Sequence, residues 1–270
     1  MVMQALTFLA LVVIVLCAVL VMIFYVMQTR LIFYPKKLER SYKFRLGDFD
    51  EEIFLRTKDD ERIHALFFKG TRPEVILYFH GNAGDLSGWQ FVAEDFTLYG
   101  YNVLMVDYRG YGKSSGTISE KGFYRDAEAA YYYLLREKDF TRKDIIVYGR
   151  SIGTGVAVEL ASRHPVKGLV LEAPYSSLSQ LANEKIPFFF PSLYMRYKFN
   201  NFAKIKTVKC PVIFMHGGKD ELIPVAHTDK LYRSFSGKKM KIVMPQGSHN
   251  DLNSFPQYRE FLQQDLPQFF

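Results

Sequence analysis

Residues 145–153 read IIVYGRSIG and join a short apolar run to a stretch of helix-forming residues. They contain the pattern Gly-x-Ser-x-Gly, with the serine at position 151. A serine at such a sharp strand-to-helix turn adopts a strained backbone, and side chains at the two glycine positions would collide with neighbouring elements. The stretch therefore favours Ser151 as a nucleophile whose hydroxyl lies at the positive end of a helix.

Short apolar runs alternate with segments of helical length on both sides of this stretch. The expected strands are 52–57, 62–69, 75–79, 102–106, 145–148, 168–171, 212–215 and 241–244, and the expected helices are 86–99, 119–138, 152–164, 225–235 and 251–269. This alternation predicts an α/β domain over residues 48–270, with a mostly parallel central sheet and helices on both faces. Residues 176–209 break the rhythm with two prolines and dense aromatic residues, and we expect a small cap there.

A serine nucleophile needs a base, and the base needs an acid that orients it. In this class of fold the chain order is serine, then carboxylate, then histidine, each after a strand. Asp220 follows the strand expected at 212–215, and His249 follows the last strand, so both fit as acid and base. Glu172, at the end of the strand 168–171, is the rival acid because some hydrolases place the acid one strand earlier.

The other five histidines have weaker claims to a role in catalysis. His216 ends a strand beside two glycines and is expected to support the site, and His80 begins the glycine loop after the third strand. We expect the remaining three to lie on strands or helices without a partner; they are His64, His164 and His227.

Acyl transfer also requires hydrogen-bond donors aimed at the oxyanion. One donor is expected to be the backbone N–H of Ile152, directly after the nucleophile. The second is expected in the loop His80-Gly81-Asn82-Ala83-Gly84, where small residues let the backbone approach a substrate. Within this loop we favour the N–H of Asn82, with that of Ala83 as the alternative.

The first residues of the chain form an apolar segment, since residues 5–27 carry no charge and only Thr7 as a polar side chain. Twenty-three such residues are enough for a helix to cross the hydrocarbon core. A cleaved signal peptide is disfavoured because no Lys or Arg precedes the run, the run is long, and no A-x-A site follows. Residues 1–28 are therefore expected to be a single-pass transmembrane anchor.

A basic segment follows at residues 29–47. Between Arg30 and Arg45 six basic residues face one acid, which leaves +5 of the formal net charge of +7 in this collar. Such a collar suits anionic lipid headgroups, and positive flanks stay on the cytoplasmic side, so we expect a catalytic domain facing the cytoplasm. A domain on the outer side of a bacterial inner membrane is the alternative.

No nucleic-acid motif and no zinc spacing occur, and Cys17 and Cys210 are not expected to pair.

Six motifs occur in the order of a known family: HGNAGD at 80–85, DYRGYGKSSG at 107–116, GRSIG at 149–153, EAPYSS at 172–177, HGGKDELIP at 216–224 and GSHND at 247–251. The chain resembles the membrane-anchored α/β-hydrolase-domain proteins, whose eukaryotic relatives include protein depalmitoylases. The resemblance covers roughly residues 50–265 and implies an α/β-hydrolase fold, a small cap, the triad named above and no cofactor. The palmitoylated members carry an N-terminal cysteine cluster, where this chain has an apolar span.

The sequence thus predicts a membrane-anchored serine hydrolase that cleaves a carboxylic ester or thioester through an acyl-enzyme. Aromatic residues of the cap are expected to line an apolar acyl site or to lie against the bilayer; they are Phe188, Phe189, Phe190, Tyr194 and Tyr197. A serine peptidase would use the same triad, and a catalytically inactive binding protein is the non-enzymatic alternative.

Overall fold

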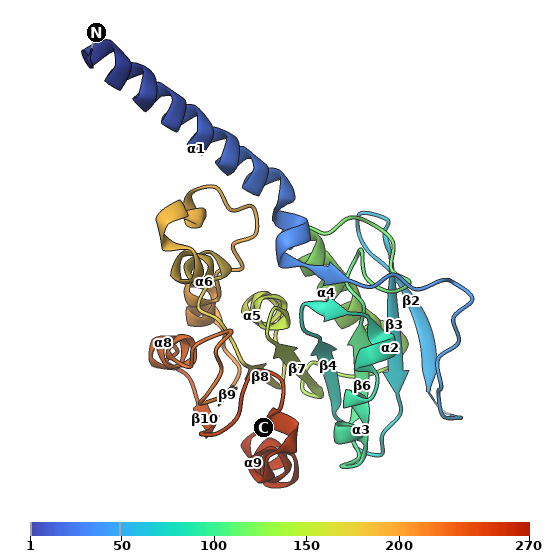
Figure 1. Cartoon of the computed structure of the whole chain (residues 1–270). Helices are drawn as coiled ribbons and strands as arrows, with labels where there is room; N and C mark the ends of the chain where they lie inside the picture. Colours follow the sequence, from blue (N-terminus) through green and yellow to red (C-terminus); the bar gives the residue numbers. More distant parts are fainter. Residues whose placement is uncertain (1, 49) are drawn as a thin grey trace.

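The chain consists of one long helix that projects from a compact α/β domain (Figure 1). The computed structural model describes residues 2–48 and 50–270, and all of their side chains except that of Phe188. The projecting helix, α1 (Val2–Ile32), is the first element of the chain. In the described part of the chain it is the one helix that is long and apolar enough to cross a membrane. An 18-residue segment of it has a mean hydropathy of 3.3, and none of that segment is buried.

The domain is built on an eight-stranded sheet in the order β10-β9-β8-β7-β4-β6-β3-β2. The strands are β2 (Glu51–Arg56), β3 (Arg62–Phe68), β4 (Val75–Phe79), β6 (Asn102–Val106), β7 (Ile145–Arg150), β8 (Gly168–Glu172), β9 (Val212–Gly217) and β10 (Lys239–Met244). From β6 to β10 all neighbours are parallel, whereas β3 runs antiparallel to both β6 and β2. The mostly parallel sheet expected from the sequence is confirmed, and each expected strand is present within two residues of its predicted ends.

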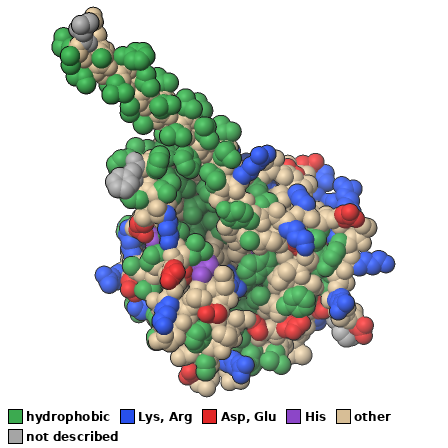
Figure 2. All heavy atoms as spheres, viewed as in Figure 1, with side chains coloured by type: hydrophobic (Ala, Val, Ile, Leu, Met, Phe, Trp, Pro, Cys, Tyr) green, Lys and Arg blue, Asp and Glu red, His purple; other side chains and the backbone are tan. Residues whose placement is uncertain are grey.

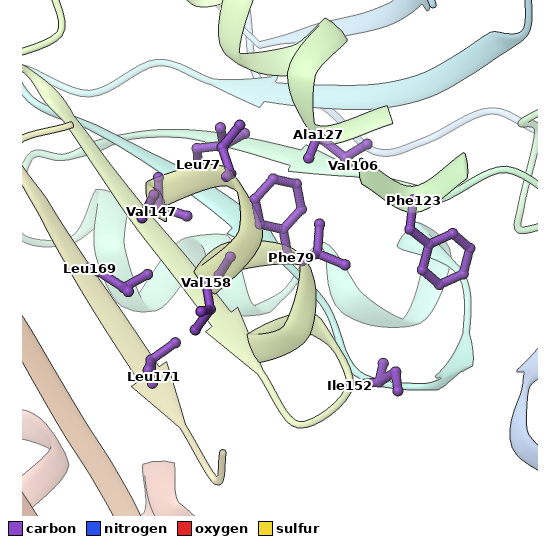
Figure 3. Packing of buried hydrophobic residues seen from close by; sticks show 14 of the residues in the cluster. Leu77, Phe79, Val106, Phe123, Ala127, Val147, Ile152, Val158, Leu169 and Leu171 are labelled. Carbon is purple, nitrogen blue, oxygen red and sulfur yellow. The ribbon is translucent and has the colours of Figure 1, made fainter. Parts of the chain in front are cut away.

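The sheet separates two hydrophobic cores because alternate side chains of a strand point to opposite faces. On β4, Leu77 and Phe79 belong to one core and Ile76 and Tyr78 to the other. Figure 3 shows Leu77 and Phe79 lying beside Val158 of the covering helix α5. Continuous apolar strands such as β4 are therefore explained by burial on both faces.

Helices cover both faces, as expected (Figure 1). The first core includes residues of α4 (Glu120–Glu137), α5 (Gly153–Arg163) and α8 (Ala226–Ser234). The second includes residues of α2 (Leu86–Trp89), α3 (Val92–Thr97), α9 (Pro256–Glu260) and α10 (Leu266–Phe269).

Two expected helices are interrupted. The helix expected at 86–99 is divided into α2 and α3, and the first piece contains Gly88, which lowers helix propensity. The helix expected at 251–269 begins instead at Pro256, because proline suits the first helical turn and cannot continue a helix that starts before it. This C-terminal region is a short 3₁₀ turn (Leu252–Ser254), α9, a π-helical turn (Phe261–Asp265) and α10.

The expected cap region is a chain of short helices between β8 and β9. It contains α6 (Leu178–Lys185), the 3₁₀ turns Pro187–Phe189 and Pro191–Leu193, α7 (Asn201–Lys204) and a third 3₁₀ turn (Ile205–Thr207). In Figure 1 this region (gold) lies beside the lower part of α1.

A second, two-stranded sheet joins distant parts of the chain and was not expected from the sequence. In it β1 (Tyr34–Pro35), which begins two residues after α1 ends, pairs in parallel with β5 (Ala83–Gly84) of the glycine loop. An isolated bridge between Lys37 and Gly112 continues this pairing. The segment that follows α1 is therefore hydrogen-bonded to the loop at the carboxyl end of β4.

Candidate active site

Ser151 lies in the turn between β7 and α5 with a φ of 53°, the left-handed region that non-glycine residues seldom occupy. Its N–H donates to the carbonyl of Glu172 over 2.9 Å, and its carbonyl accepts from the N–H of Thr154 over 3.0 Å. A Cβ on Gly153 would lie 2.2 Å from the carbonyl oxygen of Phe79, which explains the glycine after the serine. The sharp turn therefore directs the Ser151 hydroxyl away from both β7 and α5.

His249 lies beside Ser151 although 98 positions separate them in the chain. Its Nε2 is 3.0 Å from the Ser151 Oγ, and its Nδ1 is 2.7 Å from the Asp220 Oδ2. The loops after β9 and β10 carry Asp220 and His249 to the carboxyl ends of the parallel strands, the usual edge for sites in open α/β sheets. The structure therefore brings together all three residues predicted as a triad.

The carboxylate of Asp220 is buried and surrounded by donors. Its Oδ1 accepts from the N–H groups of Leu222 and Ile223, over 2.9 and 2.8 Å. Burial would raise the pKa of Asp220, but the hydrogen bonds from His216 and His249 and from the Ile223 N–H outweigh it and hold that pKa well below its ordinary value. Asp220 is therefore ionised at neutral pH, as an acceptor for the His249 Nδ1–H requires.

His216 supports Asp220 from behind. Its Nε2 is 2.7 Å from the carbonyl of Ile223 and 3.3 Å from the Asp220 Oδ2, and its Nδ1 is 2.6 Å from the Thr228 hydroxyl. The ring is fully buried. Its position agrees with the supporting place expected from the sequence.

The glycine loop after β4 lies against the nucleophile turn. A Cβ placed on Gly81 would be 4.0 Å from the Ser151 Cβ. The backbone N–H groups of Asn82 and Ile152 donate to no acceptor in the described residues, so both are free to bind an oxygen atom. The chain therefore offers unpaired donors at the two positions favoured from the sequence. The N–H of Ala83 likewise donates to no acceptor among the described residues, so the choice between Asn82 and Ala83 stays a prediction. The carbonyl of Ala83 accepts from the Trp89 indole N–H over 2.8 Å.

Three further contacts fix this loop. The Tyr111 hydroxyl donates to the carbonyl of Asn82 over 2.8 Å, and the Tyr34 N–H of β1 points to the same oxygen at 3.4 Å. Lys36 N–H donates to the carbonyl of Gly84 over 2.9 Å. The loop is thus held from one side by the segment after α1 and from the other by Trp89.

Comparisons with known proteins agree with this architecture. The family profile described as the alpha/beta hydrolase fold matches residues 74–204. The chain is 30% identical over 234 residues to the uncharacterized protein Rv2307c of Mycobacterium tuberculosis, which covers 86% of this chain and 83% of the relative. It is 33% identical over 242 residues to human alpha/beta hydrolase domain-containing protein 17C, covering 86% and 71% of the two chains. The chain belongs to the α/β-hydrolase family.

Solved structures show the same fold at low sequence identity. An esterase of Pyrococcus furiosus, Pf2001, superposes on this hydrolase with a TM-score of 0.71 at 17% identity, covering 88% of this chain and 97% of the esterase. An acylaminoacyl peptidase of Pyrococcus horikoshii superposes with a TM-score of 0.62 at 17% identity, covering 84% of this chain and 42% of the peptidase.

Glu172, the rival acid, takes no part in the contacts of His249 in this hydrolase. Its carboxylate accepts from the Tyr148 hydroxyl over 2.6 Å and lies 3.2 Å from the Nε of Arg150. The structure therefore places Glu172 in a buried pair beneath the nucleophile turn, and Asp220 is the carboxylate at the imidazole.

Arg150 connects three parts of the site, which the sequence analysis did not recognise. Its Nη2 lies 3.2 Å from the Asn250 Oδ1 and 3.4 Å from the carbonyl of His249. Its guanidinium also lies over the ring of Trp89, 5.1 Å from the centroid, and Trp89 in turn holds the glycine loop. The position of Arg150 directly before the serine was the one available signal.

Three other histidines differ from expectation, because each has a carboxylate partner. His64 Nδ1 is 2.9 Å from Asp107, His164 Nε2 is 3.2 Å from Glu128, and His227 Nε2 is 2.9 Å from Glu184. Buried ring nitrogens need hydrogen-bond partners, and these partners lie 36 to 43 positions away in the chain. Sequence spacing alone therefore could not reveal them.

His80 and Asp107 lie beneath the glycine loop. His80 Nδ1 is 2.6 Å from the carbonyl of Gly81, and its Nε2 is 3.6 Å from an oxygen of Asp107. Asp107 also accepts from the N–H of Leu86 over 3.0 Å. Burial would raise the pKa of Asp107, but hydrogen bonds from His64 and His80 keep it below its ordinary value. This buried cluster anchors both ends of the loop.

The cap residues proposed for substrate binding lie near α1. Phe189 packs on Phe24 of α1 with ring centroids 5.7 Å apart, Phe190 is exposed, and Tyr194 is half-buried. The side chain of Phe188 lies outside the part of the chain that the structure describes. Among the side chains that the structure describes, none of these residues contacts Ser151, so their role in binding substrate stays a prediction.

No group of three or more His, Cys, Asp and Glu side chains suited to a metal ion occurs among the described residues. Cys17, on α1, and Cys210, in the domain, are both free thiols.

Proposed function

We propose that this hydrolase is a membrane-anchored serine esterase or thioesterase that works through an acyl-enzyme. The observation that carries the proposal is the hydrogen-bonded line from the Ser151 Oγ through His249 to Asp220, at 3.0 and 2.7 Å. A serine hydroxyl is a weak nucleophile unless a base within hydrogen-bond reach takes its proton, and an imidazole needs an acid to hold its tautomer.

In the first half-reaction, Nε2 of His249 takes the proton of Ser151 while the Oγ attacks the carbonyl carbon of the substrate. The carbonyl electron pair moves to oxygen, and the N–H groups of Asn82 and Ile152 stabilise the oxyanion. When the oxyanion collapses, the bond to the leaving oxygen or sulfur breaks. His249 returns the proton to that atom, and the acyl group stays on Ser151.

In the second half-reaction, a water molecule gives a proton to His249 and attacks the acyl carbon. Collapse of the second tetrahedral intermediate releases the carboxylic acid and restores the proton to Ser151. Asp220 stays ionised throughout, because its pKa lies below its ordinary value, and stabilises the imidazolium that forms twice in the cycle.

The anchoring part of the proposal rests on α1 and the segment that follows it. The 23 apolar residues between Ala5 and Met27 match the length needed to span the hydrocarbon core. The basic collar at 29–47 would bind anionic headgroups and keep the catalytic domain on the cytoplasmic side. A substrate carried by or dissolved in the bilayer then meets the site without leaving the membrane surface.

The test of the chemistry is labelling of the full chain with a fluorophosphonate probe, which reacts with activated serines. Wild type should label, Ser151→Ala should not, and Ser162→Ala, on the far end of α5, should label like wild type. Absence of label on wild type, or equal label on Ser151→Ala, would overturn the serine mechanism.

Substrate class is then tested with matched ester, thioester and peptide amide substrates of one acyl group. We expect turnover of the ester and thioester in the wild type and none in Ser151→Ala. Faster cleavage of the amide than of the ester would assign the chain to the peptidases instead. A p-nitrophenyl series from acetate to palmitate measures acyl-chain preference, and activity that falls steadily beyond short chains would contradict a lipid-like substrate.

Membrane anchoring and orientation need a separate measurement. The full chain should stay with the membrane fraction in alkaline carbonate. Single cysteines introduced at exposed positions of the domain should react with a cysteine-directed reagent that cannot cross membranes only when it is added on the cytoplasmic side. Release by carbonate would contradict a spanning helix, and labelling from the opposite side would reverse the orientation.

A further inference from the structure

The cap carries an apolar surface that the hydrolase itself leaves uncovered. Four large hydrophobic side chains within eight positions are exposed: Ile186 by 37%, Phe189 by 43%, Phe190 by 62% and Leu193 by 83%. Single exposed hydrophobic residues are ordinary, but a group of them on one short segment marks a surface that meets a partner or a membrane. We call these four residues the cap patch.

The cap is fixed to the last turns of α1. The Gln28 side chain, buried at the end of α1, donates to the carbonyl of Tyr194 over 3.1 Å and accepts from the N–H of Arg196 over 2.7 Å. The hydroxyls of Thr29 and Tyr197 are 2.6 Å apart. These contacts fix the position of the cap along the axis of α1.

In this position the cap patch lies level with the end of the apolar stretch of α1. Phe189 of the patch packs on Phe24, which precedes Met27, the last residue of the uncharged apolar stretch 5–27, by three positions. With a rise of about 1.5 Å per residue, Phe24 lies about 4–5 Å inside the apolar end of the helix. Figure 2 shows the green surface of α1 continuing onto the cap beside it.

The backbone of the cap turns these side chains outward. Phe190, between two 3₁₀ turns that each begin with proline, has a φ of 45°, a left-handed conformation that is unusual for a bulky residue. Despite this strain its ring is exposed rather than packed in the domain. A strained residue that presents an aromatic ring to the outside indicates a surface built for contact.

Exposed cations flank the cap patch in the sequence and at the end of α1. Arg196 is exposed and lies over the rings of Tyr25 and Tyr197, at 5.9 and 5.5 Å from their centroids. Lys185 and Arg30 are also exposed. An apolar surface with a rim of cations and tyrosines suits the boundary between acyl chains and anionic headgroups better than it suits another protein.

We propose that the cap patch inserts beside α1 into the membrane leaflet nearest the domain, so that the cap is embedded at the lipid–water boundary. The inference rests on the membrane anchoring of α1 proposed above and adds a second attachment to the bilayer. With two attachments the domain cannot turn about the end of α1, and the cap faces the acyl-chain region. Acyl chains then approach from the lipid side of the cap.

The test uses single cysteines carrying an environment-sensitive fluorophore on the full chain in vesicles of phosphatidylcholine and phosphatidylglycerol. Cys17 is replaced by serine, while Cys210 is kept because burial raises its pKa to about 12 and leaves it unreactive. Leu193→Cys reports on the cap patch, Leu20→Cys on α1, and Leu98→Cys, 78% exposed after α3, is the matched aqueous control. These substitutions replace exposed side chains, so the fold should tolerate them.

We expect the labels at 193 and 20 to show blue-shifted emission that spin-labelled lipids quench, and the label at 98 to show neither. Water-like emission at 193 with lipid-like emission at 20 would overturn the inference while leaving the anchor intact, and would leave a protein partner to cover the patch. Water-like emission at both positions would overturn the anchor and the inference together. Neither result depends on the serine chemistry, which fluorophosphonate labelling of the same samples measures independently.

Discussion

At the scale of single residues, the site contains residues that carry the reactive atoms and residues that position them. The residues predicted to carry the reactive atoms could be chosen from the sequence, because the order of serine, acid and histidine and the loops after strands constrain them, and the structure brings these residues together. The residues that position those atoms could not be recognised from the sequence, because their contact partners are distant in the chain. Arg150 illustrates this: the sequence places it beside Ser151, but only the fold brings Asn250 and Trp89 to its guanidinium.

The first prediction separates the two candidate acids. Asp220→Asn keeps the shape of the side chain but removes the carboxylate that holds His249, so kcat should fall by roughly 10³–10⁴ with little change in KM. Glu172→Gln, whose carboxylate contacts Tyr148 and Arg150 instead, should retain most of the activity. Steady-state kinetics on a soluble ester measure both, and a greater loss in Glu172→Gln than in Asp220→Asn would reverse the assignment.

The second prediction concerns pH. Folding lowers the pKa of Asp220 from its ordinary value of 3.8, so its ionised form stabilises the protein above about pH 4 and that stabilisation is lost as the pH falls further. The difference in unfolding free energy between wild type and Asp220→Asn should therefore shrink as the pH is lowered from about 6 to about 3. Denaturant unfolding at several pH values measures it, and a difference that stays constant would contradict the lowered pKa.

At the scale of elements, buried strands were predictable and short tertiary pairings were not. β4 and β6 have the predicted ends because each is a continuous apolar run that must be covered on both faces. β1 and β5 contain two residues each and owe their structure to one another, so no local pattern reports them. The break between α2 and α3 and the late start at Pro256 likewise reflect local chemistry that outweighed a helix-length pattern.

The third prediction tests the support of the glycine loop. Tyr111→Phe removes the hydroxyl that donates to the carbonyl of Asn82, so the loop loses one of its restraints. A hydrogen bond is worth about 1 kcal/mol, and we expect kcat to fall by about fivefold while KM changes little. Tyr131→Phe is the matched control, because its hydroxyl donates to the carbonyl of Pro165, far from the site, over the same 2.8 Å. Equal activity in the two variants would show that Tyr111 does not position the loop.

At the scale of the whole molecule, the end of α1 is part of the catalytic domain rather than a tether to it. Gln28 and Thr29 bind the cap, and β1, directly after the helix, pairs with the glycine loop. The sequence predicted an anchor, a collar and a domain as successive segments. It could not reveal that Tyr34 and Pro35, within the collar, pair with the glycine loop, because hydrogen bonds between β1 and β5 leave no pattern in hydrophobicity or charge.

The fourth prediction compares two shortened chains that both lack the apolar part of α1. A chain beginning at residue 30 keeps β1, and a chain beginning at residue 39 lacks it. If β1 supports the glycine loop, the shorter chain should have a lower kcat on p-nitrophenyl acetate at similar KM, since a misplaced oxyanion donor affects the transition state more than substrate binding. Thermal unfolding of both chains shows whether the loss comes from the site or from the fold, and equal kcat values would exclude β1 from any positioning role.

If α1 spans the bilayer as proposed, its junction with the domain would link turnover to the thickness of the membrane. The stretch from Ala5 to Met27 is about 35 Å long as a helix, somewhat more than a hydrocarbon core of about 30 Å, so we expect the helix to tilt. Gln28 is hydrogen-bonded to the cap, and β1 is paired with the glycine loop. A change in the tilt of α1 would therefore act on the cap and on the glycine loop at the same time. The same chain should therefore turn over at different rates in thin and thick bilayers, with the lipid acting as a mechanical regulator of the enzyme.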